Sequence, residues 1–564
     1  MGSLKYLLAG LALSPALVST GLSVDVLTYR YNDAGTGAND VETVLNLDNV
    51  NPWSFGLKYT VPVNGQIYAQ PLVKTAVGRP ARSLVFVATQ ANVVMAVDTA
   101  AGIPVWTDTL SDIGSPVPSA DVATTDIYPQ IGICSTPVIY GMSLYVLSKA
   151  KHTPAGDNPH YAYTIYELNI ATGRVLAENH FADTAYDGTK YIYRDGDPHV
   201  NGSGDGSITS GTQPVVYFNA LREMNRAALS RVGDVIYAGF ASLADYRPYH
   251  GWLIGFDIKN LHIVSLFNAT PNGEDGGIWE SGGRIASDGG ALYFETGNGS
   301  FDPTQLNLDG FPIDGDYGDC VVKVVRDNST AARPNVNGWG LKVVDYFSPE
   351  DNDALNNADL DLGACGPIVV TYGRNTYLIG IGKDGTIYTM NPAKMGKYSP
   401  SANDCLQTIT NAICIQGQPS DVWSAFCTPS FFNNRLYTIG GGDFIKQFVF
   451  TSGILSSWYL DGNHQVQTDV ESDNMYSVGS PGAQTCISSN RNNGVILWAI
   501  DQGASVLRAY RASDLLEIWD SNQFPADHIS SALKFTVPVV ANGNVYVGAE
   551  SALYIFGLAT APRH

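Results

Sequence analysis

A short pattern recurs along almost the whole of this 564-residue chain: a Pro, an apolar run, and then, in its full form, Leu-Tyr or Val-Tyr. A full copy starts at Pro137 and continues to Leu144-Tyr145. Other copies start at Pro71, Pro367, Pro429, Pro481 and Pro538, and weaker copies without Pro lie at 235–238 and 291–294. Self-similarity on this scale indicates a repeat architecture, in which each unit buries its apolar face against its neighbours. The sequence therefore predicts eight units.

Each unit has the sequence pattern of short β-strands joined by turns. Its apolar residues alternate or form short runs that stop at Gly, Asn or Asp, and helical periodicity is nearly absent. The second half of the unit is clearest at 96–106, where a strand, a Gly-containing turn and a returning strand end in Trp106. Two hairpins per unit give four strands, so the sequence predicts an all-β, eight-bladed β-propeller.

The last unit lacks its fourth strand, because the chain is nearly finished at 555–558. We expect the segment 57–62 to supply that strand, which would close the ring and remove exposed sheet edges. Residues 25–560 are therefore predicted to form one propeller domain closed by an N-terminal strand. Two stacked β-domains are the alternative.

The run from Ala96 to Trp106 resembles the blade-docking motif Ala-x-Asp-x-x-Thr-Gly-Lys-x-x-Trp of the quinoprotein alcohol dehydrogenase-like propellers. Ala101 and Ile103 depart from that motif at its Thr and Lys positions. The motif packs blades together and touches no substrate, so the resemblance implies the fold more strongly than the chemistry.

The resemblance implies PQQ with Ca²⁺ as a candidate cofactor, but the sequence does not specify it. Relatives that hold PQQ carry a disulfide between adjacent cysteines, a Ca²⁺ bound by Glu and Asn, a catalytic Asp, and an Arg or Lys. This chain has no adjacent cysteine pair and no Cys-x-x-Cys-His motif for haem. The cofactor is left open.

Residues 1–20 combine a basic start, a short apolar core and small residues, which is typical of a secretory signal peptide. We therefore expect a secreted, extracellular glycoprotein. Four Asn-x-Ser/Thr motifs fit this route, at Asn201, Asn268, Asn298 and Asn328. The net charge of −21 argues against nucleic acid and membrane partners, because no basic stripe could neutralise phosphates. A monomer that binds a small molecule is expected.

Seven cysteines in an oxidising compartment permit at most three intramolecular disulfides. Cys405 and Cys414 flank a short polar insertion, and we predict that they are bonded to each other.

The loops before the first strands, and those between second and third strands, are expected to reach one face and form a funnel. Its polar side chains suit a polar organic ligand such as a sugar, a polyol or a hydroxylated aromatic compound. The binding residues predicted there are Gln70, Arg226, Trp279, Lys383, Asp384 and Trp423. Lys383 and Asp384 also belong to a Lys-Asp-Gly-Thr sequence that is typical of a hairpin turn.

Glu280 and Asp319 are the predicted catalytic residues. Glu280 follows Trp279 within 276–284, where paired glycines flank both residues. Desolvation by the indole would raise the pKa of Glu280 and suit it to proton transfer. A Trp that packs between blades, with a solvated Glu beside it, is the alternative.

Three function classes stay open from the sequence. The first is a secreted quinoprotein-like oxidoreductase that acts on alcohols or sugars, as the resemblance implies. The second is a cofactor-free lyase, isomerase or cyclase that uses acid–base chemistry in the funnel. The third is a non-catalytic binding or scaffold propeller.

Overall fold

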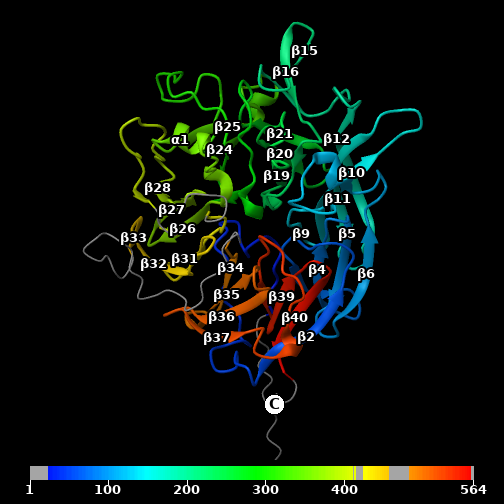
Figure 1. Cartoon of the computed structure of the whole chain (residues 1–564), viewed down its shortest axis with the longest axis vertical. Helices are drawn as coiled ribbons and strands as arrows, with labels where there is room; N and C mark the ends of the chain where they lie inside the picture. Colours follow the sequence, from blue (N-terminus) through cyan, green and yellow to red (C-terminus); the bar gives the residue numbers. More distant parts are fainter. Residues whose placement is uncertain (1–22, 411, 414–423, 457–481, 560–564) are drawn as a thin grey trace, which may run out of the picture.

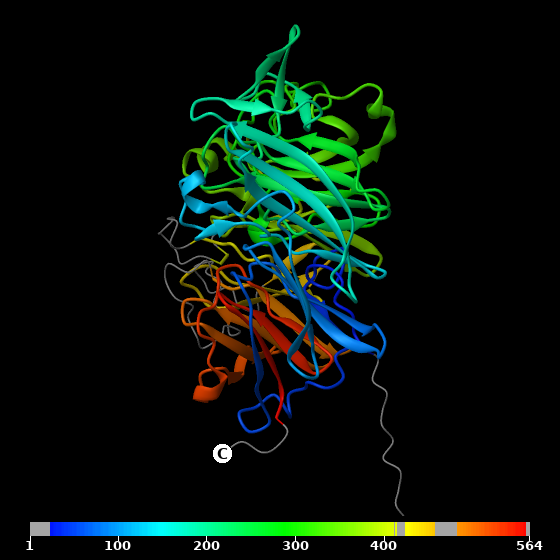
Figure 2. The ribbon, with the colours of Figure 1, turned by 90° about the vertical axis from the view of Figure 1, so that its right-hand side faces the viewer.

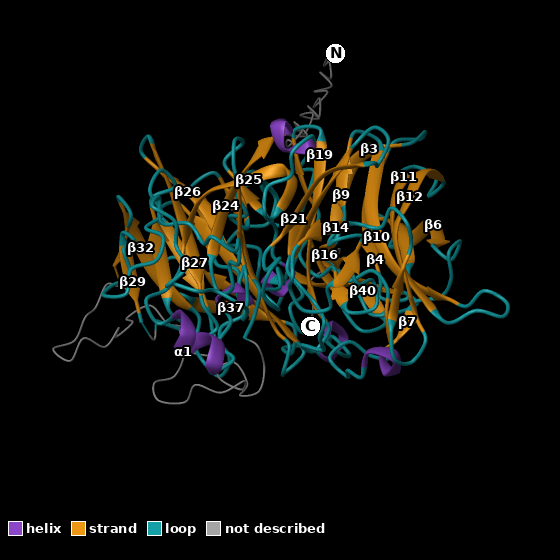
Figure 3. Cartoon of the chain, turned by 90° about the horizontal axis from the view of Figure 1, so that it is seen from above, coloured by secondary structure: helices purple, strands orange, loops and turns teal. Residues whose placement is uncertain are grey.

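The computed structural model describes residues 23–410, 412–413, 424–456 and 482–559. Its sheets follow one another around a common centre (Figure 1), and Figure 2 shows the same arrangement from the side. Strands dominate the described chain, and the few short helical turns lie among the connecting loops (Figure 3). The protein is all-β, as the sequence predicts.

Most sheets are built from consecutive strands, and two sheets near the C-terminal end also contain a strand from the N-terminal part of the chain. Two sheets come from the N-terminal part of the chain: one contains β3 (Leu72–Val77), β4 (Arg82–Ala88), β5 (Val93–Asp98) and β6 (Ile103–Thr109), and the next contains β9 (Val138–Tyr140), β10 (Ser143–His152), β11 (His160–Asn169), β12 (Val175–Tyr186) and β13 (Tyr191–Tyr193). A third sheet contains β1 (Ala38–Asn39), β34 (Thr485–Asn490), β35 (Asn493–Asp501), β36 (Val506–Arg511) and β37 (Leu516–Asp520). A fourth contains β2 (Phe55–Pro62), β38 (Val539–Ala541), β39 (Asn544–Gly548) and β40 (Ala552–Leu558).

The sheets of the middle of the chain contain β17 (Glu223–Met224), β18 (Ser230–Val232), β19 (Val235–Ser242), β20 (Trp252–Asp257), β21 (Ile263–Asn268), β22 (Ala286–Ser287), β23 (Leu292–Glu295), β24 (Val321–Asp327) and β25 (Gly338–Phe347); β26 (Ile368–Tyr372), β27 (Asn375–Ile381), β28 (Ile387–Met390) and β29 (Gln407–Ile409); and β30 (Ser430–Phe432), β31 (Arg435–Thr438), β32 (Lys446–Thr451) and β33 (Ile454–Ser456). Smaller elements are β7 (Val117–Pro118), β8 (Gln130–Ile131), β14 (His199–Asn201), β15 (Ile208–Ser210), β16 (Gln213–Tyr217), α1 (Asn352–Asn357) and the 3₁₀ turns η1 (Ser119–Val122), η2 (Glu280–Gly282), η3 (Asn328–Ala331), η4 (Leu362–Ala364) and η5 (Pro525–Asp527).

The repeated prolines mark the starts of first strands. Pro71, Pro137, Pro367, Pro429 and Pro538 each stand directly before such a strand, namely β3, β9, β26, β30 and β38. Pro has no N–H to donate, so it is tolerated just before a strand and disfavoured within the hydrogen-bonded ladder. Pro481 lies outside the described residues.

Inner strands such as β4 are apolar on both faces because their sheet packs between two others. In β4, Leu84 and Phe86 belong to a core cluster shared with β10, whereas Val85 and Val87 belong to a cluster shared with β39. Successive side chains of a strand point to opposite faces. The alternating residues therefore bury both faces, which explains why the runs are continuously apolar.

Trp106 connects the first sheet to the second. Its Nε1 donates to the carbonyl oxygen of Ile170 at 2.9 Å. The indole lies against Gly173, which has a φ of 76° and where a Cβ would come within 2.6 Å of the ring. The Gly-turn and Trp positions of the repeat therefore form an inter-sheet contact, as the docking motif implies.

The N-terminal strand β2 joins the sheet at the C-terminal end of the chain. Phe55–Pro62 pairs antiparallel with Ala552–Leu558, so the predicted pairing of 57–62 with this sheet is present. Tyr59 of β2 donates its hydroxyl to the carbonyl oxygen of Ala100 at 2.6 Å, and its ring lies against Gly102. Tyr59 thus makes on the first sheet the type of contact that Trp106 makes on the second.

One sheet is larger than the repeat predicts. Strand β21 pairs with β25 through Leu266 and Phe267, which joins two units into a nine-stranded sheet. Gly338 and Gly340 allow the approach, because a Cβ at either position would clash with the backbone of β21 or the residues next to it.

An N-terminal segment, residues 26–39, contacts successive sheets near the centre of the molecule. It forms backbone hydrogen bonds of 2.7–3.0 Å that pair Val26 with Val73, Leu27 with Ile139, Asp33 with Ser287, Ala34 with Val369, Thr36 with Phe431 and Gly37 with Ile487. Residues Ala38 and Asn39 then form β1, which runs parallel to β34. A single segment therefore ties together strands that lie hundreds of residues apart.

Arg30 anchors this segment. Its side chain is fully buried, and its guanidinium donates to the carbonyl oxygens of Thr485 and Pro429, both at 2.7 Å, and of Gly35 at 3.2 Å. It also donates to Ser430 Oγ at 2.8 Å. The planar fork of Arg matches several acceptors at once, which a Lys could not do.

Two expectations about surface chemistry are not met. Cys405 is a free thiol, 3.3 Å from the carbonyl oxygen of Gln407, so the structure contains no disulfide at this residue. Its predicted partner, Cys414, lies outside the described residues. Asn268 is fully buried and accepts the N–H of Thr270 through Oδ1, so the folded chain cannot carry a glycan there.

A helix needs about 20 mostly apolar residues to span a bilayer. No helix among the described residues is long and apolar enough to span a membrane.

We predict that Arg30→Met lowers the free energy of unfolding by about 3 kcal/mol or more, because several buried acceptors lose a charged donor. Urea denaturation of the purified protein measures this loss. The matched control is Arg511→Met, whose guanidinium pairs with Asp514 on the surface and which should have a much smaller effect. Equal stability of Arg30→Met and the wild type would contradict the role of Arg30.

Candidate functional site

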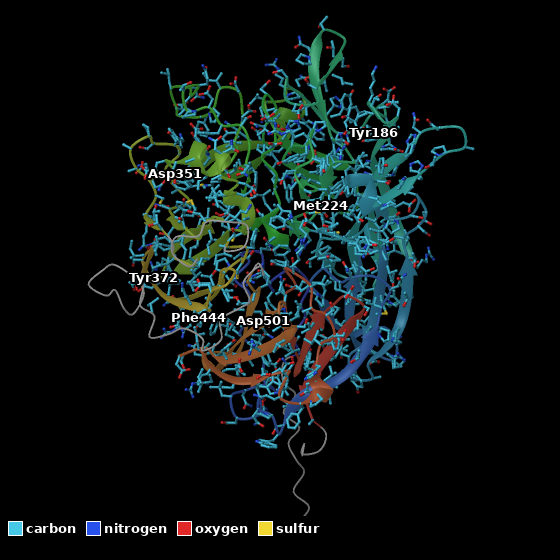
Figure 4. The ribbon with its side chains drawn as sticks, viewed as in Figure 1. Tyr186, Met224, Asp351, Tyr372, Phe444 and Asp501 are labelled. Atoms are coloured by element: carbon cyan, nitrogen blue, oxygen red, sulfur yellow. The ribbon has the colours of Figure 1, made fainter. Side chains whose placement is uncertain are left out.

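A cavity of about 450 Å³ lies where the loops before several first strands converge. Met224, which lines it, is near the centre of the molecule in Figure 4. The polar and aromatic lining residues are Tyr68, Asp126, Arg226, Ser242, Asp245, Tyr249, Trp279, Asp359, Asp361, Lys383, Phe426, Lys534 and Phe535. The lining therefore comes from loops of several different sheets, as expected for a funnel.

Three aromatic rings form one wall of the cavity. The ring of Trp279 lies 5.1 Å from that of Phe535 and 5.9 Å from that of Phe426, and both contacts are edge-to-face. The two Phe rings are 5.8 Å apart. Edge-to-face packing is a favourable arrangement for aromatic rings. The three residues thus form a packed apolar wall beside the charged groups.

The sequence analysis missed Phe426 and Phe535, although a signal for them exists. Phe426 and Phe535 each lie three residues before a repeated Pro, and Tyr68 has the same spacing to Pro71. All three residues line the cavity. An aromatic residue at this position of the repeat is therefore a marker of the cavity wall.

Arg226 is the most buried cation of the lining. It is 2% exposed, and its guanidinium donates to the carbonyl oxygen of Cys134 at 3.0 Å. It lies 5.9 Å from the rings of both Tyr68 and Phe535. No carboxylate of the described chain lies within 4.0 Å of it. Burial lowers the pKa of Arg226, but a guanidinium stays protonated in proteins.

Lys383 lies between two carboxylates of the lining. Its Nζ is 3.1 Å from Asp359 Oδ2 and 3.4 Å from Asp361 Oδ2. Asp361 is held in turn by the N–H of Asn298, at 2.9 Å from its Oδ1. Lys383 is also 6.0 Å from the ring of Phe426. The cavity therefore has a donor and two acceptors of protons next to its aromatic wall.

The structure brings together three of the predicted binding residues, Arg226, Trp279 and Lys383, in the lining of the cavity. Gln70 is not among them. Its Oε1 accepts the N–H of Arg30 at 2.9 Å, so it holds the N-terminal segment.

Asp384 does not line the cavity either. Its Oδ1 accepts the N–H of Thr386 at 3.0 Å, and its Oδ2 accepts the Thr386 hydroxyl. These contacts belong to the turn that the Asp-Gly sequence predicts. Trp423 lies outside the described residues.

Glu280 lies in the protein core and not in the lining. Its side chain is fully buried, and Oε1 accepts the N–H of Glu295 at 3.1 Å. Burial raises the pKa of Glu280 well above its usual range, and burial together with the neighbouring Glu280 does the same for Glu295. The predicted desolvation is thus present, but the carboxyl does not line the cavity that Trp279 lines.

Asp319 does not line the cavity but stabilises a loop that does. Its Oδ1 accepts the N–H of Leu362 at 2.9 Å, and Leu362 lies between the lining residues Asp361 and Gly363. Burial and, next, the charge of Asp361 raise the pKa of Asp319 well above its usual range. Asp319 therefore fixes the loop that carries Asp361.

Two solved structures share this fold. Quinohemoprotein alcohol dehydrogenase from Comamonas testosteroni has a TM-score of 0.58 at 13% identity, over 96% of this chain and 82% of its own. Quinohemoprotein alcohol dehydrogenase ADHIIG from Pseudomonas putida HK5 has a TM-score of 0.57 at 11% identity, over 95% and 80%. No family model matches the sequence, and no curated protein matches it. The comparison confirms the predicted resemblance to quinoprotein-type propellers at the level of the fold.

The lining does not fit a Ca²⁺–PQQ pair. The described lining contains no Glu and no Asn to bind Ca²⁺, and two of its carboxylates already contact Lys383. The sequence also lacks the adjacent cysteines. What the lining supplies is a buried cation, aromatic walls and a carboxylate-bound Lys, a set that suits an organic anion.

We predict that Glu280→Gln keeps the fold. Its free energy of unfolding relative to the wild type should increase as the pH rises from 5 to 8. Because its folded pKa is raised, Glu280 contributes stability below its unfolded pKa, and this contribution is lost as the pH rises. Gln resembles the protonated acid and has no such loss. Urea denaturation at both pH values tests this, with the exposed Glu350→Gln as the control. An equal difference from the wild type at both pH values would contradict a neutral buried acid.

Proposed function

We propose that this chain is a propeller enzyme whose central cavity binds a polar organic molecule with an anionic group. The observation that carries the proposal is Arg226, a buried cation of the lining without a carboxylate partner among the described residues. A buried charge is costly unless it is paired. A carboxylate or similar group of a ligand would complete the pair through two parallel hydrogen bonds.

The size and the walls of the cavity support a small molecule. A volume of about 450 Å³ lies within the usual range for small-molecule sites, which combine apolar walls with few polar groups. Trp279, Phe426 and Phe535 offer an apolar face, and Arg226 fixes the orientation. A hydroxylated carboxylic acid, aromatic or alicyclic, matches this set.

Acid–base catalysis is the chemistry that the lining favours. Lys383 Nζ can donate a proton or a hydrogen bond to an oxygen of the ligand, and Asp359 and Asp361 hold it in place. A positioned proton donor is the main need of a lyase, an isomerase or a cyclase. The reaction proposed is therefore cofactor-free proton transfer on the bound acid.

Oxidation of an alcohol or a sugar is the second candidate. The likeness to two quinohemoprotein alcohol dehydrogenases favours it, although fold alone does not define chemistry. This candidate is second because the described lining has no Glu or Asn to bind the Ca²⁺ that accompanies the quinone.

We further propose that the sheets are eight blades and that β2 closes the ring. Pairing of β2 with β40 and the contact of Tyr59 with Ala100 support closure, because they link the last sheet to the first. Secretion and glycosylation stay predictions that rest on the sequence.

The proposal is tested by a turnover screen of the purified, unsupplemented protein with hydroxylated carboxylic acids, followed by mass spectrometry. For a substrate found in this way, Arg226→Met should raise KM about 10-fold or more, and Arg226→Lys should recover part of the loss. Lys383→Met should lower kcat about 100-fold. Arg511→Met is the surface control. Full activity of both cavity variants would refute this site.

Addition of PQQ with Ca²⁺ separates the two candidates. We expect the visible spectrum of the mixture to equal the sum of its components, and the rate to stay unchanged. Alcohol oxidation that appears only with PQQ would establish the second candidate in place of the first.

A further inference from the structure

A cluster of His and Asp side chains lies on β10, β11 and β12 and shares no residue with the cavity lining. These three strands lie side by side in one sheet (Figure 1). His160 Nδ1 is 2.8 Å from Asp183 Oδ1, and His152 Nε2 is 3.3 Å from Asp183 Oδ2. Ligand atoms of these three residues all lie within 4.8 Å of one another. A single small ion could therefore contact all three.

The sheet places these side chains on one face. His152 and His160 are paired directly across β10 and β11, with ring centroids 5.0 Å apart. Asp183 pairs with Ala162, which lies two residues from His160 and so faces the same side. The three residues thus converge at the end of the β10–β11 hairpin.

A β-bulge adds a third imidazole. His180 and Asp183 are three residues apart, a spacing that would place them on opposite faces of a regular strand. The register shifts between Tyr163 and Thr164, whose partners are Ala182 and His180, so Phe181 is the extra residue. His180 Nε2 consequently lies 3.2 Å from Asp183 Oδ2.

Neighbouring groups orient the ligands. Asp157 Oδ2 is 3.3 Å from the second ring nitrogen of His160, and Thr164 Oγ1 is 3.3 Å from His180 Nδ1. Such outer contacts of metal-binding His residues fix the ring orientation and raise metal affinity. The cluster therefore has the supporting contacts of a built site.

We propose that His152, His160 and Asp183 bind a divalent transition-metal ion of the Zn²⁺ class, with His180 available as a fourth ligand. Imidazole and carboxylate are the ligands that Zn²⁺ takes in sites with two or three His residues. Asp183 contacts the three imidazoles, and no Lys or Arg of the described chain competes with an ion for its carboxylate. The four side chains are 11% to 27% exposed, so an ion can enter from solvent.

The site does not depend on the proposed function, because it shares no residue with the cavity lining. A bound ion would fasten the tip of the β10–β11 hairpin to β12. We therefore expect the ion to raise the thermal stability of the sheet as well as to bind.

Calorimetric titration of the chelator-treated, full-length protein with ZnCl₂ measures binding, and the melting temperature with and without ZnCl₂ measures stability. Both measurements test this inference. The wild type should bind Zn²⁺ and melt at a higher temperature with it. His160→Ala and Asp183→Asn should each lower the affinity of this site for Zn²⁺ about 100-fold or more. The exposed His528→Ala is the matched control and should bind as the wild type does.

The visible absorption of bound Co²⁺ gives a second readout. It would not respond to these substitutions if the residues only stabilised the fold. Co²⁺ should produce visible absorption bands with the wild type and His528→Ala, and these should be absent with Asp183→Asn, whose side chain keeps the shape of Asp. Circular dichroism verifies that each variant is folded. The inference is overturned if the wild type binds no metal, or if folded His160→Ala and Asp183→Asn bind as many ions with unchanged affinity.

Discussion

The fold depends on the hydrogen bonds between the N-terminal segment 26–39 and the central strands. Where several sheets meet around a common centre, many strands approach one another and leave polar backbone groups that need partners. The segment supplies those partners to successive sheets, and the guanidinium of Arg30 satisfies further buried carbonyl groups. One chain end thus holds together strands that are distant in the sequence.

The cavity is a consequence of the same arrangement. Several of the loops that lead into first strands reach the centre, so a few residues from each of these loops form one wall. Buried polar groups behind the wall fix its shape. Asp319 accepts the N–H of Leu362 beside Asp361, and Gly282 makes room for the guanidinium of Arg226. Residues without access to a ligand therefore decide where the lining residues point.

Individual residues show how much of the candidate site could be predicted from the sequence. Trp279 and Lys383 were predicted from their place in the repeat, because every unit delivers the corresponding loop to the same face. Glu280 was placed in the same loop, yet its carboxyl is buried beside Glu295. Adjacent residues of a turn can point in opposite directions, and sequence position does not say which. Gln70 and Asp384 were likewise assigned to a ligand, but they bind backbone groups of their own protein.

The all-β class, the starts of several first strands and the partner of strand β2 could be inferred from the sequence alone. These features depend on periodicity and on residues such as Pro, whose effect is local and the same in every unit. Which side chains contact one another depends on the tertiary structure. The bulge at Phe181 turns His180 toward Asp183, and the close approach at Gly338 merges two sheets. Both effects come from the register of strand pairs, which is set by packing between neighbouring sheets and not by any short stretch of sequence.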